Sequence, residues 1–308
     1  MCRSILATLI LGVSTLSFSQ TFTYAPINIP GAVATEVRGI NNNGEVVGFY
    51  YTSKSCVEPA GEIQFPNCNV HGFKMVNGTV TKLMVPNSTT TAIMGVNDYG
   101  DLVGFCIDNN GSHAFLWLHT NVIKLLNDTA AGGGPNSDQH TAGFGVNKAL
   151  TVVGGLWTYN DPFGDAGWVW QNGTFSNMNP GSASGIDVSV NGVSNNGFLS
   201  GATVSGAWFK SGADEDFFSA GSGSVGTGVN NNSYVIGYTA AGKGWFTKHI
   251  EWNEGTNDAT EVKPTFIPVA YPNAKATYPL GLNDSRWVAG TYVDSAGVMH
   301  GFIAKPNF

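Results

Sequence analysis

Short runs of strand-forming residues alternate with polar turn residues along nearly the whole chain after residue 20. The segment GINNNGEVVG, which begins at Gly39, places strand-forming residues on both sides of an Asn-rich turn. Alternation of this kind around Asn-Gly-type turns predicts a tight β-hairpin. Versions of the same segment return five times, beginning at Gly95, Gly145, Gly192, Gly228 and Gly281.

Each hairpin is followed by two further strand-like segments. The third strand combines small and aromatic residues, as in HGFKMV at 71 and HAFLWL at 113, and a fourth strand follows a short turn such as Asn77-Gly78. The repeat starts at 39, 95, 145, 192, 228 and 281 are 56, 50, 47, 36 and 53 residues apart. Uneven spacing of four-stranded units favours a propeller over a solenoid with fixed rungs.

The two ends of the chain predict how the ring closes. The sixth unit ends after its third strand, HGFIAK at 300, whereas residues 21–32 form an additional strand that resembles the fourth strands of other units. Pairing these two segments would remove an open sheet edge. We therefore expect an all-β, six-bladed propeller of four-stranded antiparallel blades, with the N-terminal strand completing the last blade.

The third strand of the second unit reads His-Ala-Phe at 113–115. Together with the repeated hairpins, this strand resembles the HAF-repeat family of secreted bacterial proteins, and the resemblance covers nearly the whole chain after the leader. It implies an extracellular, propeller-like protein, but the family is largely without an assigned chemistry. The His is replaced by Ala166, Gly206 or Lys243 in the middle units, so a role shared by all blades cannot depend on it.

The first 19 residues have the organisation of a signal peptide. Arg3 precedes an apolar run over 5–13, and Ser17-Phe18-Ser19 forms a small-x-small cleavage site. The apolar run is too short to span a bilayer. We expect Gln20 to begin a single mature domain, 20–308, that is secreted or periplasmic and has no membrane association after cleavage.

The amino-acid composition argues against some classes of binding partner. Charged residues make up only 11% of the chain, and the formal net charge is −7. A surface that is acidic and poor in Lys and Arg argues against nucleic acid and anionic membranes. We expect a monomer without a cofactor, and a glycan or an extracellular protein as the ligand.

The cysteines predict one disulfide. Cys56 and Cys68 bracket an eleven-residue insert, and an oxidising compartment would let them close it. Further ligands at short spacing, which a metal site would need, are missing there. Cys106 ends the second hairpin and reads as a small buried apolar group.

We expect several of the repeated residues to have structural roles. The Asn in each hairpin turn, replaced by Ser194 in the fourth copy, suits a turn that bonds its own backbone. We expect the third-strand aromatic residues to fill the space between blades, and His71, His113 and His300 to form hydrogen bonds between blades.

Function in propellers gathers where long loops converge. The long segments here are 51–70, 128–141 and 157–165, on the face opposite the repeated Asn turns. We expect the contact surface on these loops and on the adjoining inner strand, and the repeated turns to be the least involved in binding. The candidate binding residues are Arg38, Asp138, His140, Trp157, Tyr159 and Asp161.

Three functions remain open. The leading hypothesis is a secreted, non-catalytic binding module for a glycan or for another envelope or matrix component. The second is a polysaccharide hydrolase or lyase that uses Glu36, Arg38, Asp138 and His140 as acid/base groups. The third is a purely structural repeat protein. Glu36 and Arg38 are two apart on one strand and share a face, so they can simply pair with each other.

Overall fold

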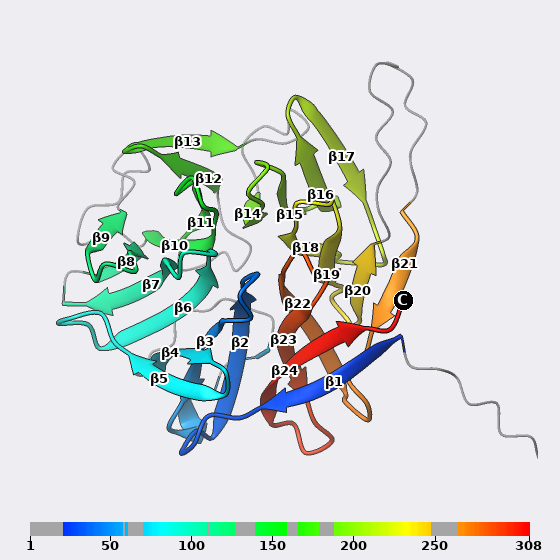
Figure 1. Cartoon of the computed structure of the whole chain (residues 1–308), viewed down its shortest axis with the longest axis horizontal. Coiled ribbons are helices and arrows are strands. Elements are labelled where there is room, and N and C mark those ends of the chain that lie inside the picture. The colour runs from blue at the N-terminus through cyan, green and yellow to red at the C-terminus, as the bar shows by residue number, and fades with distance from the viewer. Residues whose placement is uncertain are drawn as a thin grey trace, which may run out of the picture.

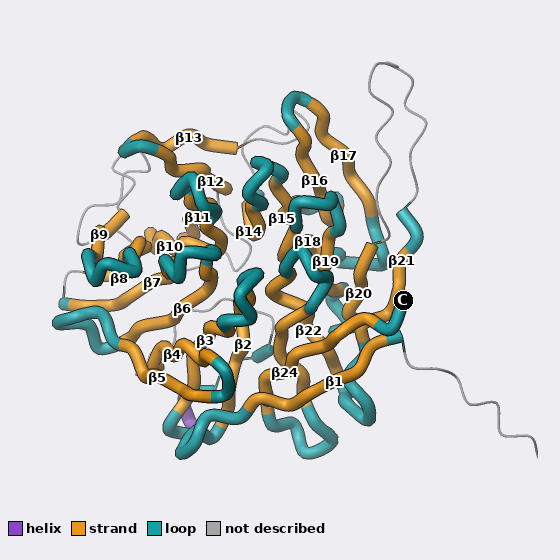
Figure 2. Tube along the Cα trace, viewed as in Figure 1, coloured by secondary structure: helices purple, strands orange, loops and turns teal. Residues whose placement is uncertain are grey.

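The computed structural model of the protein describes residues 21–57, 59–60, 70–109, 111–126, 139–158, 166–178, 188–247 and 264–308. In these ranges the strands form six four-stranded antiparallel sheets, arranged as blades around one axis (Figure 1). Figure 2 shows that strands and loops make up nearly all of the described chain, and the one helical segment there is a 3-10 turn, Lys54–Cys56. The fold is a six-bladed β-propeller, as the sequence predicts.

The first three blades follow chain order, each given from its innermost to its outermost strand. Blade 1 consists of β2 (Ala34–Ile40), β3 (Val46–Tyr51), β4 (Val70–Val76) and β5 (Thr79–Leu83). Blade 2 consists of β6 (Thr90–Val96), β7 (Leu102–Asp108), β8 (Gly111–Trp117) and β9 (Ile123–Leu126). Blade 3 consists of β10 (Gln139–Val146), β11 (Val152–Thr158), β12 (Ala166–Gln171) and β13 (Thr174–Met178).

The remaining blades continue the same order until the last strand. Blade 4 consists of β14 (Ser189–Val193), β15 (Leu199–Thr203), β16 (Gly206–Ser211) and β17 (Asp214–Phe218). Blade 5 consists of β18 (Val225–Val229), β19 (Val235–Tyr238), β20 (Gly244–Thr247) and β21 (Phe266–Val269). Blade 6 consists of β22 (Ala276–Leu282), β23 (Val288–Val293), β24 (Met299–Pro306) and β1 (Phe22–Ile27).

Blade 6 is built from both ends of the chain. β1 pairs with β24 in an antiparallel register that runs from Phe22 opposite Pro306 to Ile27 opposite Gly301. Figure 1 shows the blue N-terminal strand lying along the red C-terminal one. The closing strand predicted from residues 21–32 is therefore confirmed.

Every innermost strand carries a β-bulge at the same place. In blade 1 the register with β3 shifts between Val37 and Gly39, so that Arg38 falls outside the ladder. A bulge places one extra residue outside the ladder of that strand pair and turns the strand locally. The residues at this position are Arg38, Met94, Phe144, Asn191, Thr227 and Leu280.

A glycine in each second strand pairs with the large aromatic residue of the third strand. Gly48 lies opposite Phe73, for example, and Gly201 lies opposite Trp208. A Cβ atom on Gly201 would come within 1.9 Å of the backbone oxygen of Ser189 on the first strand, so only glycine fits there. The aromatic partners are almost fully buried: Phe73, Phe115, Trp168, Trp208, Trp245 and Phe302.

These aromatic side chains fill the space between blades, as predicted. Trp168 of blade 3 packs in one apolar cluster with Val103 and Ala114 of blade 2, and Phe73 of blade 1 packs with Ala289 of blade 6. Burying a large aromatic ring in this way contributes roughly 2–3 kcal/mol. The seams between blades are thus the main apolar core.

The prediction that the repeated histidines bond between blades is wrong. His113 Nε2 lies 3.2 Å from Asp108 Oδ1, across the β7–β8 hairpin of its own blade. His300 Nε2 likewise lies 3.1 Å from Asp294 Oδ2 in blade 6. The acidic residue lies at or just after the end of the preceding strand. His300 Nδ1 also lies 2.8 Å from Asn28 Oδ1, just after β1 of the same blade, and His71 Nδ1 lies 3.2 Å from Met84 Sδ, just after β5 of its own blade.

Candidate ligand-binding site at the propeller axis

Each inner hairpin turn is organised by the buried polar residue at its start. Asn41 Oδ1 accepts hydrogen bonds from the backbone N–H groups of Asn43 at 3.0 Å and Glu45 at 2.9 Å. Ser194 makes the second of these contacts through its hydroxyl, which accepts from the N–H of Phe198 at 3.1 Å. The structural role predicted for the repeated Asn is therefore confirmed.

The same side chains also connect neighbouring blades, which the sequence analysis did not predict. The Nδ2 group of Asn41 donates to the backbone oxygen of Asn97 at 2.8 Å, and Asn97 donates in turn to the oxygen of Asn147 at 3.0 Å. We call the six turn-starting residues the amide ring; they are Asn41, Asn97, Asn147, Ser194, Asn230 and Asn283. Ser194 has no amide, so the ring lacks its donor between blades 4 and 5.

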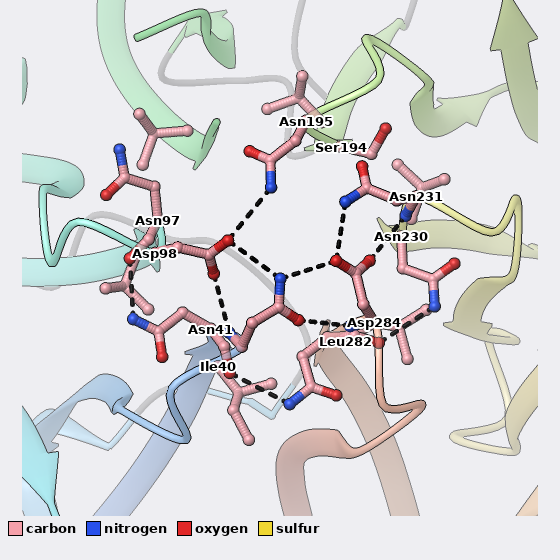
Figure 3. Close-up of a pocket in the computed structure, with 16 residues that line it drawn as sticks. Ile40, Asn41, Asn97, Asp98, Ser194, Asn195, Asn230, Asn231, Leu282 and Asp284 are labelled. Carbon is pink, nitrogen blue, oxygen red and sulfur yellow. Dashed lines mark hydrogen bonds between the residues drawn. The ribbon is translucent and has the colours of Figure 1, made fainter. Parts of the chain in front are cut away.

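The residue after each member of the amide ring forms a second polar layer around the axis. This axial layer consists of Asn42, Asp98, Lys148, Asn195, Asn231 and Asp284. Figure 3 shows the side chains of Asp98, Asn195, Asn231 and Asp284 pointing toward one another from different blades.

Hydrogen bonds join the axial layer across the axis. Asn42 Nδ2 lies 3.0 Å from Asp98 Oδ2 and 2.7 Å from Asp284 Oδ2, so one amide bridges two carboxylates. Asn195 Nδ2 reaches from blade 4 to the same oxygen of Asp98 at 3.2 Å. These contacts hold both carboxylates at the centre of the ring.

Five members of each layer line a pocket that opens on the face of the inner hairpin turns; Asn147 and Lys148 of blade 3 are not among the lining residues. Its cavity volume is about 60 Å³. Six aliphatic residues complete the lining: Ile40, Val96, Val146, Val193, Val229 and Leu282. The cavity is much smaller than a typical ligand pocket of about 300–1,000 Å³. It therefore admits one small polar group of a larger molecule, held through amide and carboxylate groups.

An aromatic and a basic residue lie beside the pocket. Tyr99 is 58% exposed; Lys148 Nζ lies 5.5 Å from the centroid of its ring, and the His119 ring lies 6.3 Å from it. Lys148 Nζ is also 3.7 Å from Asp98 Oδ2. This combination of an exposed ring, a cation and a carboxylate occurs at blades 2 and 3.

Asp101 anchors the turn beneath Tyr99. Burial raises the pKa of Asp101, but hydrogen bonds from the backbone N–H of His119, from the Asn97 amide and from the His119 ring outweigh it. The pKa therefore lies below its ordinary value. The carboxylate accepts from the backbone N–H of His119 at 2.8 Å and from Asn97 Nδ2 at 2.8 Å. Asp101 thus stabilises this part of the rim in its ionised form.

The predicted pair of Glu36 and Arg38 is buried on the innermost strand of blade 1. Their charged groups contact each other directly, and only 1% of Glu36 and 5% of Arg38 are exposed. Tyr51 donates its hydroxyl to Glu36 Oε1 at 3.2 Å, and the guanidinium lies 5.4 Å from the Phe49 ring. The two residues therefore form an ion pair within the core, one of the two roles that their spacing allows.

The other predicted site residues are only partly described. His140 and Trp157 lie opposite each other on β10 and β11, so the structure brings their backbones together, but the placement of their side chains is outside the described part. Asp138, Tyr159, Asp161 and Cys68 fall outside the described residues altogether. The long-loop contact surface and the Cys56–Cys68 disulfide therefore stay predictions.

No three His, Cys, Asp or Glu side chains in the described ranges are placed to hold a metal ion together. No helix among the same residues is long and apolar enough to cross a membrane.

Known proteins resemble this chain in fold alone. No family model and no curated protein matches the sequence. A catalytically inactive virginiamycin B lyase from Staphylococcus aureus, crystallised with quinupristin, aligns over 91% of this chain and 88% of its own, with a TM-score of 0.50 and 12% identity. Regucalcin, a calcium-binding protein from Agrobacterium tumefaciens, aligns over 93% and 96%, with a TM-score of 0.51 and 12% identity. At such identity the likeness extends to the propeller and not to a shared site.

Proposed function

We propose that this chain is a non-catalytic binding module that takes a glycan, or another hydroxyl-rich component of a cell envelope or matrix, in the axial pocket. The observation that carries the proposal is the convergence of amide and carboxylate side chains from several blades around one open pocket. Carboxylates and amides are the groups that hydrogen-bond hydroxyls in several directions at once.

The proposal includes a secreted or periplasmic location and a monomeric state. The signal-peptide pattern of residues 1–19 and the resemblance to HAF-repeat proteins support the location. An acidic surface poor in Lys and Arg is consistent with an extracellular ligand that is not a nucleic acid.

The alternative of a polysaccharide hydrolase or lyase finds less support. An acid/base group must reach the proton that it transfers. Glu36 instead contacts Arg38 and Tyr51 inside the core, and almost none of its surface is exposed. Binding is therefore favoured over catalysis at this pair.

A glycan array combined with a turnover assay on the same polysaccharides tests the proposal. Two double variants are compared with the parent chain: Asp98→Ala/Asp284→Ala in the axial pocket, and Asp138→Ala/His140→Ala on the long-loop face. Loss of binding in the axial variant alone supports the proposed site, and loss in the loop variant alone moves the site to the opposite face. Turnover that the loop variant abolishes would favour the hydrolase, and absence of both binding and turnover would favour a structural role.

A further inference from the structure

We infer that Tyr99 is a stacking platform beside the axial pocket and that the ligand presents there a pyranose ring without an acidic group. This inference rests on the proposed function, since it names the class of sugar that the pocket takes. It also assigns a contact residue that none of the sequence patterns singled out.

Tyr99 differs from its counterparts in the other blades. It occupies the third position of the blade 2 turn, where the other blades carry Asn43, Ala149, Asn196, Asn232 and Ser285. It directly follows Asp98, whose carboxylate lies in the pocket. Tyr99 does not itself line the pocket, but the Lys148 ammonium near its ring also lies 3.7 Å from Asp98 Oδ2, so the ring stands beside the pocket.

The backbone of Tyr99 is held in place before any ligand arrives. Its N–H donates to Asn97 Oδ1 at 3.0 Å, and the N–H of Gly100 donates to the backbone oxygen of Asn97 at 3.0 Å. Gly100 has a φ of +83°, which a residue with a side chain rarely adopts. A contact residue that is already ordered loses less entropy on binding.

The Tyr99 ring and the Asp98 carboxylate suit the two kinds of surface that a pyranose presents. A sugar ring has an apolar face of C–H groups and an edge of hydroxyls; the exposed Tyr99 ring suits the face. Asp98, adjacent in sequence, suits the edge because a carboxylate forms strong hydrogen bonds with hydroxyl donors. The exposed amides of Asn42 and Asn195 contact the same carboxylate and add further polar partners.

The charges of the pocket exclude an acidic sugar. Asp98 and Asp284 both line the pocket, and Lys148 already lies 3.7 Å from Asp98. A ligand carboxylate would therefore meet like charges, which are unfavourable at close range. Neutral and amino sugars are acceptable, because their hydroxyl or ammonium groups donate to these oxygens.

The large aromatic residues of the third strands cannot take this role, because they are buried between blades. Phe308 is 44% exposed, but its ring packs against Phe22 and Phe246. Phe217 is 39% exposed on β17, the outermost strand of blade 4, far from the axis. Phe217 therefore serves as a matched control for removing an exposed ring.

The test measures binding of cello-oligosaccharides, chitosan oligosaccharides and oligogalacturonate to the whole secreted chain and its variants. Tyr99→Ala should weaken binding of the neutral or amino oligosaccharides by about tenfold, the equivalent of losing one aromatic contact. Tyr99→Phe keeps the ring and should bind like the parent chain, as should Phe217→Ala. Thermal unfolding of each variant checks that the fold is retained.

The outcomes separate this inference from the proposed function. If Tyr99→Ala binds as tightly as the parent while Asp98→Ala/Asp284→Ala loses binding, the platform is refuted and the axial pocket stands. Preference for oligogalacturonate over the other two probes also overturns the inference, although the chain would still be a glycan-binding module. Failure of the parent chain to bind any of these probes or any glycan of the array overturns both.

Discussion

The side-chain amide of Asn283 in the last blade donates a hydrogen bond to the backbone oxygen of Asn41 in the first blade, at 3.1 Å. The ring is therefore closed at two places: near the axis by this bond, and in the outer part of blade 6 by the pairing of β1 with β24. Asn283 is 5% exposed, and its Oδ1 also accepts from the N–H of Trp287 at 2.9 Å. One buried side chain thus serves both its own turn and the closure.

Replacing Asn283 should separate these two roles. Asn283→Ser keeps a hydroxyl acceptor for the turn, as Ser194 does in blade 4, and removes only the donor to Asn41; we expect a loss of about 1 kcal/mol in the free energy of unfolding. Asn283→Ala removes both and should cost about 2–3 kcal/mol. Urea unfolding measures the difference, and equal losses in the two variants would contradict the assignment.

The gap in the amide ring at blade 4 can be filled. Ser194→Asn should retain the bond to the N–H of Phe198 and add an amide donor to the backbone oxygen of Asn230, as in the other blades. We expect a gain of about 1 kcal/mol in the free energy of unfolding. Ser194→Ala is the control and should lose stability, while a destabilised Ser194→Asn would show that this seam has no room for an amide.

The indole of Trp208 offers a test of the inter-blade core. The side chain is fully buried, and its Nε1 has no hydrogen-bond partner among the described residues. Trp208→Phe, which copies blades 1, 2 and 6, should change the free energy of unfolding by no more than about 1.5 kcal/mol, because an orphaned N–H is removed along with some apolar volume. Trp208→Ala should cost about 3–5 kcal/mol. A large loss for both would point to an unseen partner of the indole.

Stability should fall in acid partly through Asp101. Its pKa in the folded chain lies below the ordinary value, so its contribution is present above about pH 3.9 and is lost as the pH falls through the folded-state pKa. Asp101→Asn should be less stable than the parent chain near neutral pH, and the difference should shrink in acid. Chemical unfolding across this pH range measures it, and a difference independent of pH would refute the assignment.

Cys106 should be unreactive in the folded protein. Burial, together with the nearby carboxylate of Asp108, raises the pKa of the thiol to about 12, and the side chain is 1% exposed. Because only the thiolate attacks alkylating reagents, iodoacetamide should leave Cys106 unmodified at mildly alkaline pH and modify it in concentrated guanidinium chloride. Mass spectrometry of the peptide that carries Cys106 reads this out, and rapid labelling under native conditions would contradict it.

The fold is readable from the sequence because its signals are local and repeated. Each hairpin carries its own turn residues, and six copies of one pattern reinforce one another. The closing strand is recognisable because residues 21–32 lack a hairpin of their own. The pairing of Glu36 with Arg38 also follows from local geometry, since alternate residues of a strand share a face.

The axial pocket is not readable in the same way. The turn geometry of Asn41 is a property of its own hairpin, whereas its bond to Asn97 depends on how closely blade 2 approaches. Asp98 and Tyr99 stand at variable turn positions and read as ordinary turn residues. A signal was available in the axial layer, where the residue after each turn-starting position is polar in all six copies.

The bulge in every innermost strand gives each blade one side chain that strand pairing does not constrain. Because Arg38, Met94, Phe144, Asn191, Thr227 and Leu280 fall outside the ladder, no strand pairing depends on their identity. The six blades of this chain place a cation, a thioether, an aromatic ring, an amide, a hydroxyl and an aliphatic chain at this one position. Blades 4 and 5 use this position to bind their neighbours, since Asn191 Nδ2 donates to the backbone oxygen of Gly226 at 2.8 Å and Thr227 Oγ1 donates to that of Pro279 at 2.7 Å. Changing this one residue in a blade would therefore alter how that blade is joined to the next without disturbing its own sheet.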